Sequence, residues 1–242
     1  GDRGPHFQVR DQGAEEREPE ALVAMFAFPP KTVFGKVIPK SRIYAHVQPS
    51  RRVRDLFTSQ VAEIRWAHKL SPETLHLPAK PGVPEIEIFE IRLKTASLDD
   101  AVLEAIDRAI PYPVIHRLRS ESGIAHSAAF KRPSAADSGQ WVVGARFTSD
   151  FEPSPEEPPG LPAVLDLGHL YAALMAGLLP LPGRKGEALG DQVTRCERYL
   201  VLRRKVDQLT ARIRREKQFN RKVAMNQELK PLQAELDGLT EL

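Results

Sequence analysis

A single cysteine, Cys196, occurs among the 242 residues. One cysteine cannot form an intramolecular disulfide, nor can it supply the thiolate pairs that structural zinc sites use. The histidines do not recur at metal-ligand spacing, and a His116–His126 pair across a predicted hairpin would be a weak site without carboxylates. We therefore expect a protein of a reducing, cytoplasmic compartment that holds neither a metal nor a cofactor.

Several sequence motifs that carry chemistry are also absent. The chain has no Walker-type Gly-Lys loop and no GxGxxG fingerprint, so nucleotide binding has no support from motifs. It has no nucleophile elbow, although Ser, His and Asp are all present. The most apolar run, 163–179, is interrupted by Asp166 and His169 and is too short to span a bilayer. With no signal peptide visible at the start, we expect no membrane association.

The composition itself is that of an ordinary globular protein, with 41% hydrophobic and 28% charged residues. The net charge of +3 is too small to require a nucleic-acid partner, but its distribution along the chain is uneven. The length allows one good domain and an appendage. We divide the chain into a polar, disordered extension (1–24), an α/β body (25–183) and a helical arm (184–242).

Hydrophobic patterning in the body predicts an α+β fold with a small mixed sheet. Residues 83–94 read as a strand whose apolar positions switch parity, which indicates a bulge or burial on both faces. A helix over 97–110 follows, and a strand–helix–strand order favours a parallel pair. Residues 114–119 and 124–131 are typical of a hairpin, and 141–147 alternate as a further strand. Helices are expected to flank this sheet.

Other parts of the body carry weaker patterns. Residues 26–50 are rich in proline and are predicted to be mostly loop. Ser50 is a candidate N-cap for a helix predicted to continue to residue 70, because apolar residues follow it at steps of four, four and three. Residues 148–162 are acidic and proline-rich and predict a linker, and 165–179 predict a buried helix.

The arm is predicted to be a long helix or a helical hairpin with a coiled-coil-like stripe. Its helical phase slips between Ile213 and Phe219, and Pro231 interrupts it again. A lone helix cannot cover its own stripe, so the arm must fold back, pair with a second copy or lie on another protein. The residues predicted to bind a partner through this stripe are Leu209, Ile213, Phe219, Val223, Leu232 and Leu236.

Basic residues cluster in two regions, 31–54 and 195–222. Such clusters bind phosphate by releasing counterions, but they are more often solvated helix faces with internal ion pairs. Both interpretations stay open at this stage. The candidate nucleic-acid-binding residues are Lys40, Arg42, Arg51, Arg52, Arg54, Arg212, Arg214, Arg215, Arg221 and Lys222.

A metal-dependent nuclease is the most specific catalytic hypothesis. Glu85, Glu87, Glu90 and Lys94 are similar to the acid-and-lysine signature of restriction-type nucleases, in which carboxylates hold magnesium near a phosphate. In that fold the first acid and the later Glu-x-Lys lie on adjacent hairpin strands, whereas here all four residues fall on one strand. Glu90 and Lys94 are also four residues apart, not two. The match is therefore weak.

Several stretches together resemble one bacterial and archaeal family, catalogued as domain of unknown function 4391. The most specific is the run from Glu216 to Val223, followed by Asn226. Further matching stretches are 26–29, 38–44, 84–94, 106–111, 129–133 and 178–182. The resemblance covers nearly the whole chain from Met25 on, and it carries no catalytic residues. It implies genes encoded beside helicases and adenine-type DNA methyltransferases, in restriction-modification or phage-defence loci.

The sequence thus predicts a non-catalytic accessory or adaptor protein. Its arm would dock on a helicase or methyltransferase partner, or on a second copy of the chain. A DNA-binding module that uses the two basic regions is the alternative, and the nuclease is a less favoured one.

Overall fold

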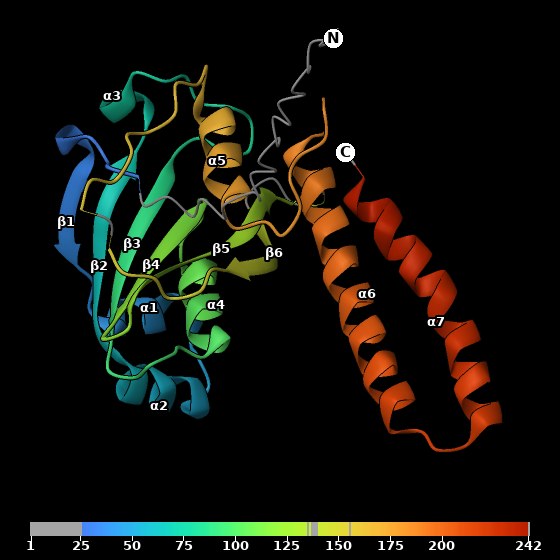
Figure 1. The fold of residues 1–242 in the computed structure, drawn as a ribbon. Coiled ribbons are helices and arrows are strands. Elements are labelled where there is room, and N and C mark those ends of the chain that lie inside the picture. Colours follow the sequence, from blue (N-terminus) through green and yellow to red (C-terminus); the bar gives the residue numbers. More distant parts are fainter. Residues whose placement is uncertain (1–25, 135, 137–139, 155, 242) are drawn as a thin grey trace, which may run out of the picture.

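The computed structural model describes residues 26–134, 136, 140–154 and 156–241. In these residues the strands form one six-stranded sheet whose spatial order follows the sequence (Figure 1). The α+β prediction is confirmed, whereas the predicted extension 1–24 lies outside the described residues. The strands are β1 (Val33–Val37), β2 (Val61–Leu70), β3 (Ile86–Leu93), β4 (Val114–Ser120), β5 (Gly123–Pro133) and β6 (Trp141–Thr148).

The sheet is mixed because β3 and β4 are parallel, while every other neighbouring pair is antiparallel. The parallel pair is joined by α4 (Asp100–Ala109), as the strand–helix–strand pattern predicts. Asp99 caps this helix, its Oδ1 accepting from the Ala101 amide at 2.9 Å. The predicted β4–β5 hairpin is confirmed, with Ser120 opposite Gly123.

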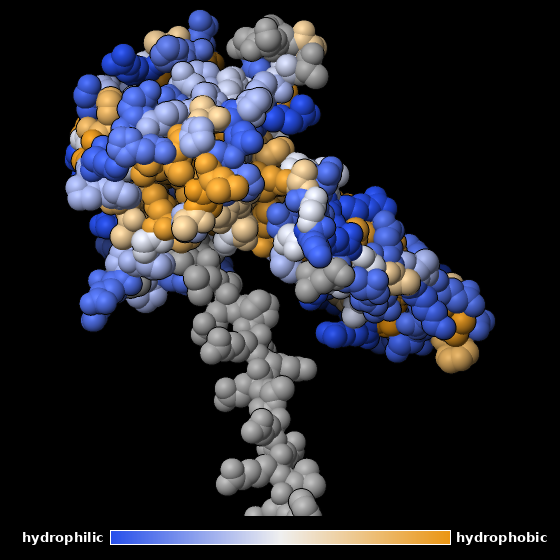
Figure 2. Space-filling model, turned by 90° about the horizontal axis from the view of Figure 1, so that it is seen from above, coloured by the Kyte–Doolittle hydropathy of each residue, from blue (hydrophilic) through white to orange (hydrophobic). Residues whose placement is uncertain are grey.

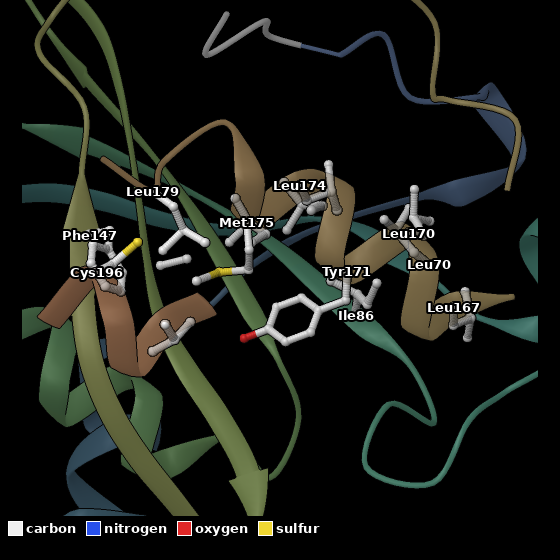
Figure 3. Close-up of a cluster of buried hydrophobic side chains, with 14 of the residues drawn as sticks. Leu70, Ile86, Phe147, Leu167, Leu170, Tyr171, Leu174, Met175, Leu179 and Cys196 are labelled. Atoms are coloured by element: carbon white, nitrogen blue, oxygen red, sulfur yellow. The ribbon is translucent and has the colours of Figure 1, made fainter. Parts of the chain in front are cut away.

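Helices cover both faces of the sheet. On one face lie α1 (Lys40–Val47), α2 (Arg51–Gln60) and α4, which bury a cluster that includes Phe57 and Phe89. On the other face, α5 (Leu167–Ala176) buries Tyr171 and Met175 against the strands (Figure 3). Cys196 from the first turns of the arm joins this second cluster and is a free thiol. A 3₁₀ turn, η1 (Pro30–Thr32), and the short helix α3 (Pro72–Leu75) complete the body.

Two sequence predictions for the first part of the body are wrong. The helix that starts after Ser50 ends at Gln60, and Val61–Leu70 form β2 in place of further helix. The proline-rich segment 26–50 is not mostly loop, because it contains β1 and α1. Two register shifts in the β2–β3 pair make the buried positions of β2 recur every three residues, which imitates a helical stripe.

The arm is a helical hairpin and not one continuous helix. Helix α6 (Leu189–Arg215) and helix α7 (Phe219–Thr240) lie side by side, joined by residues 216–218 (Figure 1). The turn falls where the sequence pattern slips phase. Pro231 lies inside α7 and does not end it. The side chains buried between the two helices are Leu202, Val206, Leu209, Ile213, Leu229 and Leu236.

Arginines at the base of the arm fasten the end of α7. Arg184 Nε donates to the Glu241 carbonyl at 2.8 Å, and Arg195 Nη1 donates to the Leu239 carbonyl at 2.9 Å. Arg195 also pairs with Glu187 at 2.7 Å, and this hydrogen bond lowers the pKa of Glu187 to about 2. The hairpin is therefore closed at both ends, by a short turn and by this clamp. Among the described residues, every helix is too short or too polar to cross a membrane.

Candidate nucleic-acid interface

The arm tip, defined here as residues 212–222, joins the end of α6 to the start of α7. It holds six basic residues and one acidic residue and so carries a formal +5, whereas the whole chain carries +3 and the other residues sum to −2. The tip lies at the end of the arm remote from the sheet (Figure 1). Its basic side chains belong to exposed residues, namely Arg212, Arg214, Arg215, Lys217, Arg221 and Lys222.

None of these six side chains forms a hydrogen bond or ion pair with another described residue. Basic residues nearer the base of the arm differ in this respect. Arg198 pairs with Glu235 at 2.5 Å, and Arg203 pairs with Asp207 at 3.3 Å. Internal ion pairs thus engage Arg198 and Arg203 along the arm, whereas the six cations at the tip remain available to a ligand.

The position of the tip cations relative to the helix ends is informative. Arg214 and Arg215 lie in the last turn of α6, where the helix dipole favours positive charge. Arg221 and Lys222 lie near the start of α7, where the dipole disfavours it, and the first turn of α7 has no acidic residue. The helix dipole therefore favours the positive charges of Arg214 and Arg215 at their positions. It disfavours those of Arg221 and Lys222. Glu216 Oε1 accepts from the Gln218 amide at 2.8 Å just before α7, and the first amides of the helix that follow have no acceptor within the helix.

Two apolar residues are also exposed near the tip. Phe219, the first residue of α7, has 78% of its surface exposed, and Val223 has 39%. On the face of the molecule that Figure 2 shows, the arm surface is mostly hydrophilic. An exposed aromatic ring beside unpaired cations is an arrangement that stacks on nucleic-acid bases.

The other residues predicted to bind a partner through the stripe lie elsewhere. Leu209, Ile213 and Leu236 are buried between α6 and α7, with 9% or less of their surface exposed. Leu232 packs against the same cluster and is partly buried. The two helices of the hairpin therefore cover their own stripe, and Phe219 and Val223 are the members of the predicted set that a partner could reach.

Two lysines of the body that were candidates for binding or catalysis form hydrogen bonds with backbone carbonyls of the body itself. Lys40 Nζ donates to the carbonyls of Phe57 and Val61 at 2.7 Å each. Lys94 Nζ donates to the carbonyl of Thr58 at 2.8 Å. Both lysines therefore cap the C-terminal carbonyls of α2. Burial, and then the charge of Lys94, lower the pKa of Lys40.

Some candidate arginines of the body contact other residues of the body, whereas others are exposed and form no ion pair within the described residues. Arg54 Nε donates to the Pro49 carbonyl at 3.1 Å, and its guanidinium lies over the Tyr44 ring. Arg52 approaches Asp99 at 3.8 Å. Arg42 and Arg51 are exposed, and neither forms an ion pair within the described part of the chain. The two predicted basic regions are thus unequal, because unpaired cations concentrate at the arm tip.

The acidic residues of β3 do not converge on one point. Glu87 accepts from Trp66 Nε1 at 2.5 Å, whereas Glu90 pairs with Arg119 at 3.1 Å. Residues three apart on a strand point to opposite faces of the sheet, so these two carboxylates cannot share a metal ion. Glu85 pairs with Lys69 at 2.7 Å. No group of three His, Cys, Asp or Glu side chains positioned to hold a metal occurs among the described residues.

A buried polar network under α4 was not anticipated from the sequence. Asp107 meets the side chains of His116 on β4 and Arg146 on β6. Lys131 on β5 donates to the Asp107 carbonyl at 2.8 Å and also to that of Ile110. Burial alone would raise the pKa of Asp107, but these cations and His116 hold it below its usual value.

His116 itself is fully buried, and burial lowers its pKa despite the nearby carboxylate. His126 lies opposite Arg117 in the hairpin register, and not opposite His116. Burial and the charge of Arg117 lower the pKa of His126 to about 4. The suggested histidine pair across the hairpin is therefore wrong, and His116 belongs to a network that holds the fold together.

Comparison with known proteins gives one finding. A family model described as domain of unknown function (DUF4391) matches residues 26–236. The resemblance drawn from the motifs is thereby confirmed. No curated protein and no solved structure matches the chain.

Proposed function

Because the chain belongs to the DUF4391 family, whose description names no activity, we propose a function from its surface: it is a non-catalytic accessory protein whose arm tip binds the phosphate backbone of nucleic acid. The observation that carries this proposal is the set of six exposed, unpaired cations at the arm tip. Each cation that meets a phosphate releases a counterion, and this release drives binding.

The architecture of the arm supports the same proposal. The clamp of Arg184 and Arg195 at its base and the buried stripe hold the hairpin together without help from a partner. A preformed hairpin places the tip cations with little loss of conformational entropy on binding. A tip that projects from the body can enter a groove or follow a strand while the body contacts another protein. That protein would be a helicase or a DNA methyltransferase, as the family resemblance implies.

A double substitution at the start of α7 tests the proposal. Arg221→Gln with Lys222→Gln removes two tip cations that α7 does not need. The matched control, Arg204→Gln with Lys205→Gln, removes the same charge from exposed positions of α6 further from the tip. Binding to labelled single-stranded and duplex DNA is measured by fluorescence anisotropy over a range of salt concentrations.

We expect the wild-type affinity to fall steeply with added salt. The tip variant should bind more weakly to every sequence and lose about one from the salt slope for each contact removed. The control should behave like the wild type. An absence of binding at low salt would exclude the proposal, as would an equal effect of the two double substitutions.

A second candidate function is docking of a protein partner, and it rests on the exposed Phe219 and Val223. Such a contact would be centred on the aromatic ring and would depend little on salt. Substitution of Phe219, discussed below, separates the two functions.

A further inference from the structure

A row of polar residues crosses the middle of the sheet on the face that α5 packs against. In the strand register, Arg65 of β2 lies opposite Glu90 of β3, and Glu90 lies opposite Arg117 of β4. Arg117 in turn lies opposite His126 of β5. The row therefore brings two guanidinium groups, one carboxylate and one imidazole together on four neighbouring strands. The function proposed for the arm tip uses none of these side chains.

Side-chain alternation fixes the face on which this row lies. Ile88 on β3 and Ile115 on β4 are buried in the cluster under α5. Glu90 and Arg117 follow them by two positions on the same strands, so they point to the same face. Helix α5 lies over one end of the strands (Figure 1). The row thus lies at the boundary between the apolar part of this face and a polar part that follows it along β3 and β4.

The guanidinium of Arg117 has no hydrogen-bond partner among the described residues. Its Nη1 lies 3.9 Å from Glu90 Oε2, which is too far for a hydrogen bond. The side chain is 15% exposed, and Nε is fully buried without a partner, whereas Nη1 and Nη2 keep contact with solvent. A charged group in this position lacks most of its hydration. Its free donors therefore call for a partner from outside the chain, either a water or an ion.

The carboxylate of Glu90 is shared between two arginines. Its Oε2 lies closer to Arg119 Nε, at 3.1 Å, than to Arg117. Arg119 follows Arg117 by two positions on β4, so it points to the same face, and its side chain is 47% exposed. These three side chains carry a formal charge of +1. On the other side of Arg117, burial and the arginine charge lower the pKa of His126 to about 4, so its ring is neutral and adds no negative charge.

The surrounding part of this face is also positive. Arg65 is engaged, because it pairs with Glu63 at 2.9 Å and donates to the Gly35 carbonyl at 2.9 Å. Arg92 lies opposite Glu63 in the register, is exposed and forms no ion pair within the described part of the chain. Four arginines and two glutamates on this part of the face sum to a formal +2. An anion that approaches Arg117 is therefore attracted by its surroundings.

We propose that Arg117 and Arg119 bind a phosphate group beside His126 on this face of the sheet. Residues two positions apart on a strand lie about 6.6–6.8 Å apart, a separation that one phosphate bridges between two long side chains. Its tetrahedral oxygens accept from more than one guanidinium, whereas the two oxygens of a carboxylate are used by a single one. The same chemistry can come from free phosphate or from the backbone of a nucleic acid. The site is independent of the arm tip.

Isothermal titration with inorganic phosphate in a chloride buffer tests the proposal. Arg119→Gln removes a largely exposed guanidinium and should fold normally. We expect it to lose about tenfold in phosphate affinity, because a hydrogen bond to a charged group is removed. The matched control, Arg51→Gln, removes the same charge from an exposed position of α2 and should bind as the wild type does. Sulfate should compete with phosphate, and acetate should not.

Urea unfolding separates binding by Arg117 from a purely structural role. The stability of the wild type should rise with phosphate concentration, because a ligand that binds only the folded state stabilises it. Arg117→Gln should abolish this dependence. A loss of stability in Arg117→Gln that is the same with and without phosphate would show that the arginine only holds the fold. Wild-type stability that does not respond to phosphate, or unchanged phosphate affinity in Arg119→Gln, would also overturn the proposal.

The source of the phosphate group is identified by single-stranded oligothymidylate. If Arg119→Gln weakens oligothymidylate and phosphate binding alike, the site takes a backbone phosphate; if only the binding of inorganic phosphate is weakened, it takes free phosphate. The Arg221→Gln, Lys222→Gln variant should keep the phosphate affinity of the wild type in either case. Failure of the arm-tip proposal is thus distinguishable from failure of this one.

Discussion

His116 Nε2 lies 3.0 Å from Asp107 Oδ1, and neither residue exposes more than 1% of its surface. The pair joins α4 to β4 in the middle of the sheet. The lowered pKa values of both groups describe an ionised Asp107 and a neutral His116 that donates from Nε2. Arg146 supplies the compensating charge. The network therefore pairs one buried carboxylate, that of Asp107, with His116 and Arg146. Removal of any of the three side chains would leave a buried group without its partner.

Asp107→Asn should destabilise the protein strongly. The substitution removes the charge that compensates Arg146, and loss of one partner from a buried pair costs about 3–5 kcal/mol. Urea unfolding followed by circular dichroism measures the change. Asp150→Asn, at an exposed position after β6, is the control and should stay within about 0.5 kcal/mol of the wild type. A loss below about 1 kcal/mol for Asp107→Asn would show that the network does not stabilise the fold.

Glu87→Gln should change how stability depends on pH. The pKa of Glu87 rises from 4.5 to about 8 on folding, so between these values the folded state holds a proton that the unfolded state has released. Stability due to this residue therefore falls as pH rises through that window. The glutamine carbonyl keeps the bond from Trp66 but does not titrate, so the variant should gain on the wild type between pH 5 and pH 8.

Unfolding curves at several pH values check this prediction, with the exposed Glu121→Gln as the control. The measurements stop near pH 8, because the pKa of Lys131 is lowered to about 8 by burial and this lysine contributes above that pH. A constant difference between Glu87→Gln and the wild type across the window would contradict the prediction.

Leu209→Ala should loosen the arm without unfolding the body. Leu209 is buried between α6 and α7, and truncation of a buried leucine costs about 2–5 kcal/mol. Because α7 contacts mainly α6, we expect faster amide hydrogen exchange in α7 than in the sheet. Val201→Ala, on the same helix at a position that is 46% exposed, is the matched control. Uniformly faster exchange in arm and sheet would show that the two unfold together.

The parts of the fold that the sequence predicted are those whose hydrophobic pattern is typical of the element that forms. Strands β3, β5 and β6, helix α4 and the β4–β5 hairpin follow from local patterns. Strand β2 did not, because its register shifts bury Val61, Ile64, Ala67 and Leu70 at a spacing of three residues. A spacing of three is close to the 3.6-residue helical period, so the pattern alone could not separate the two structures.

The candidate sites were predicted to different degrees. Counting charge along the chain finds the tip cations, but it cannot tell Arg221, which is unpaired, from Lys40, which caps α2. That distinction depends on contacts between residues 17 and 21 positions apart. The cluster at Arg117 depends on which residues the register brings opposite one another, and the pattern within one strand carries no information about that pairing.

Phe219→Asp gives the sharpest test of what the arm tip binds. Phe219 has 78% of its surface exposed and is the first residue of α7, where a carboxylate interacts favourably with the helix dipole. We therefore expect no loss of stability and an unchanged circular dichroism spectrum. If the ring stacks on bases, the variant should lose about 1–3 kcal/mol of single-strand affinity from stacking, and further affinity from repulsion between Asp and phosphate.

The comparison with Phe219→Leu separates these contributions. Leucine removes the ring but adds no charge, so it reports stacking alone. Val201→Asp adds the same charge to another exposed apolar position of α6 and should leave binding nearly unchanged, because the charge lies further from the tip. If Phe219→Asp and the wild type bind DNA equally, while the variant alone fails to co-purify a protein partner, the exposed ring serves protein docking. The cations of the tip would then have to be tested for the same partner.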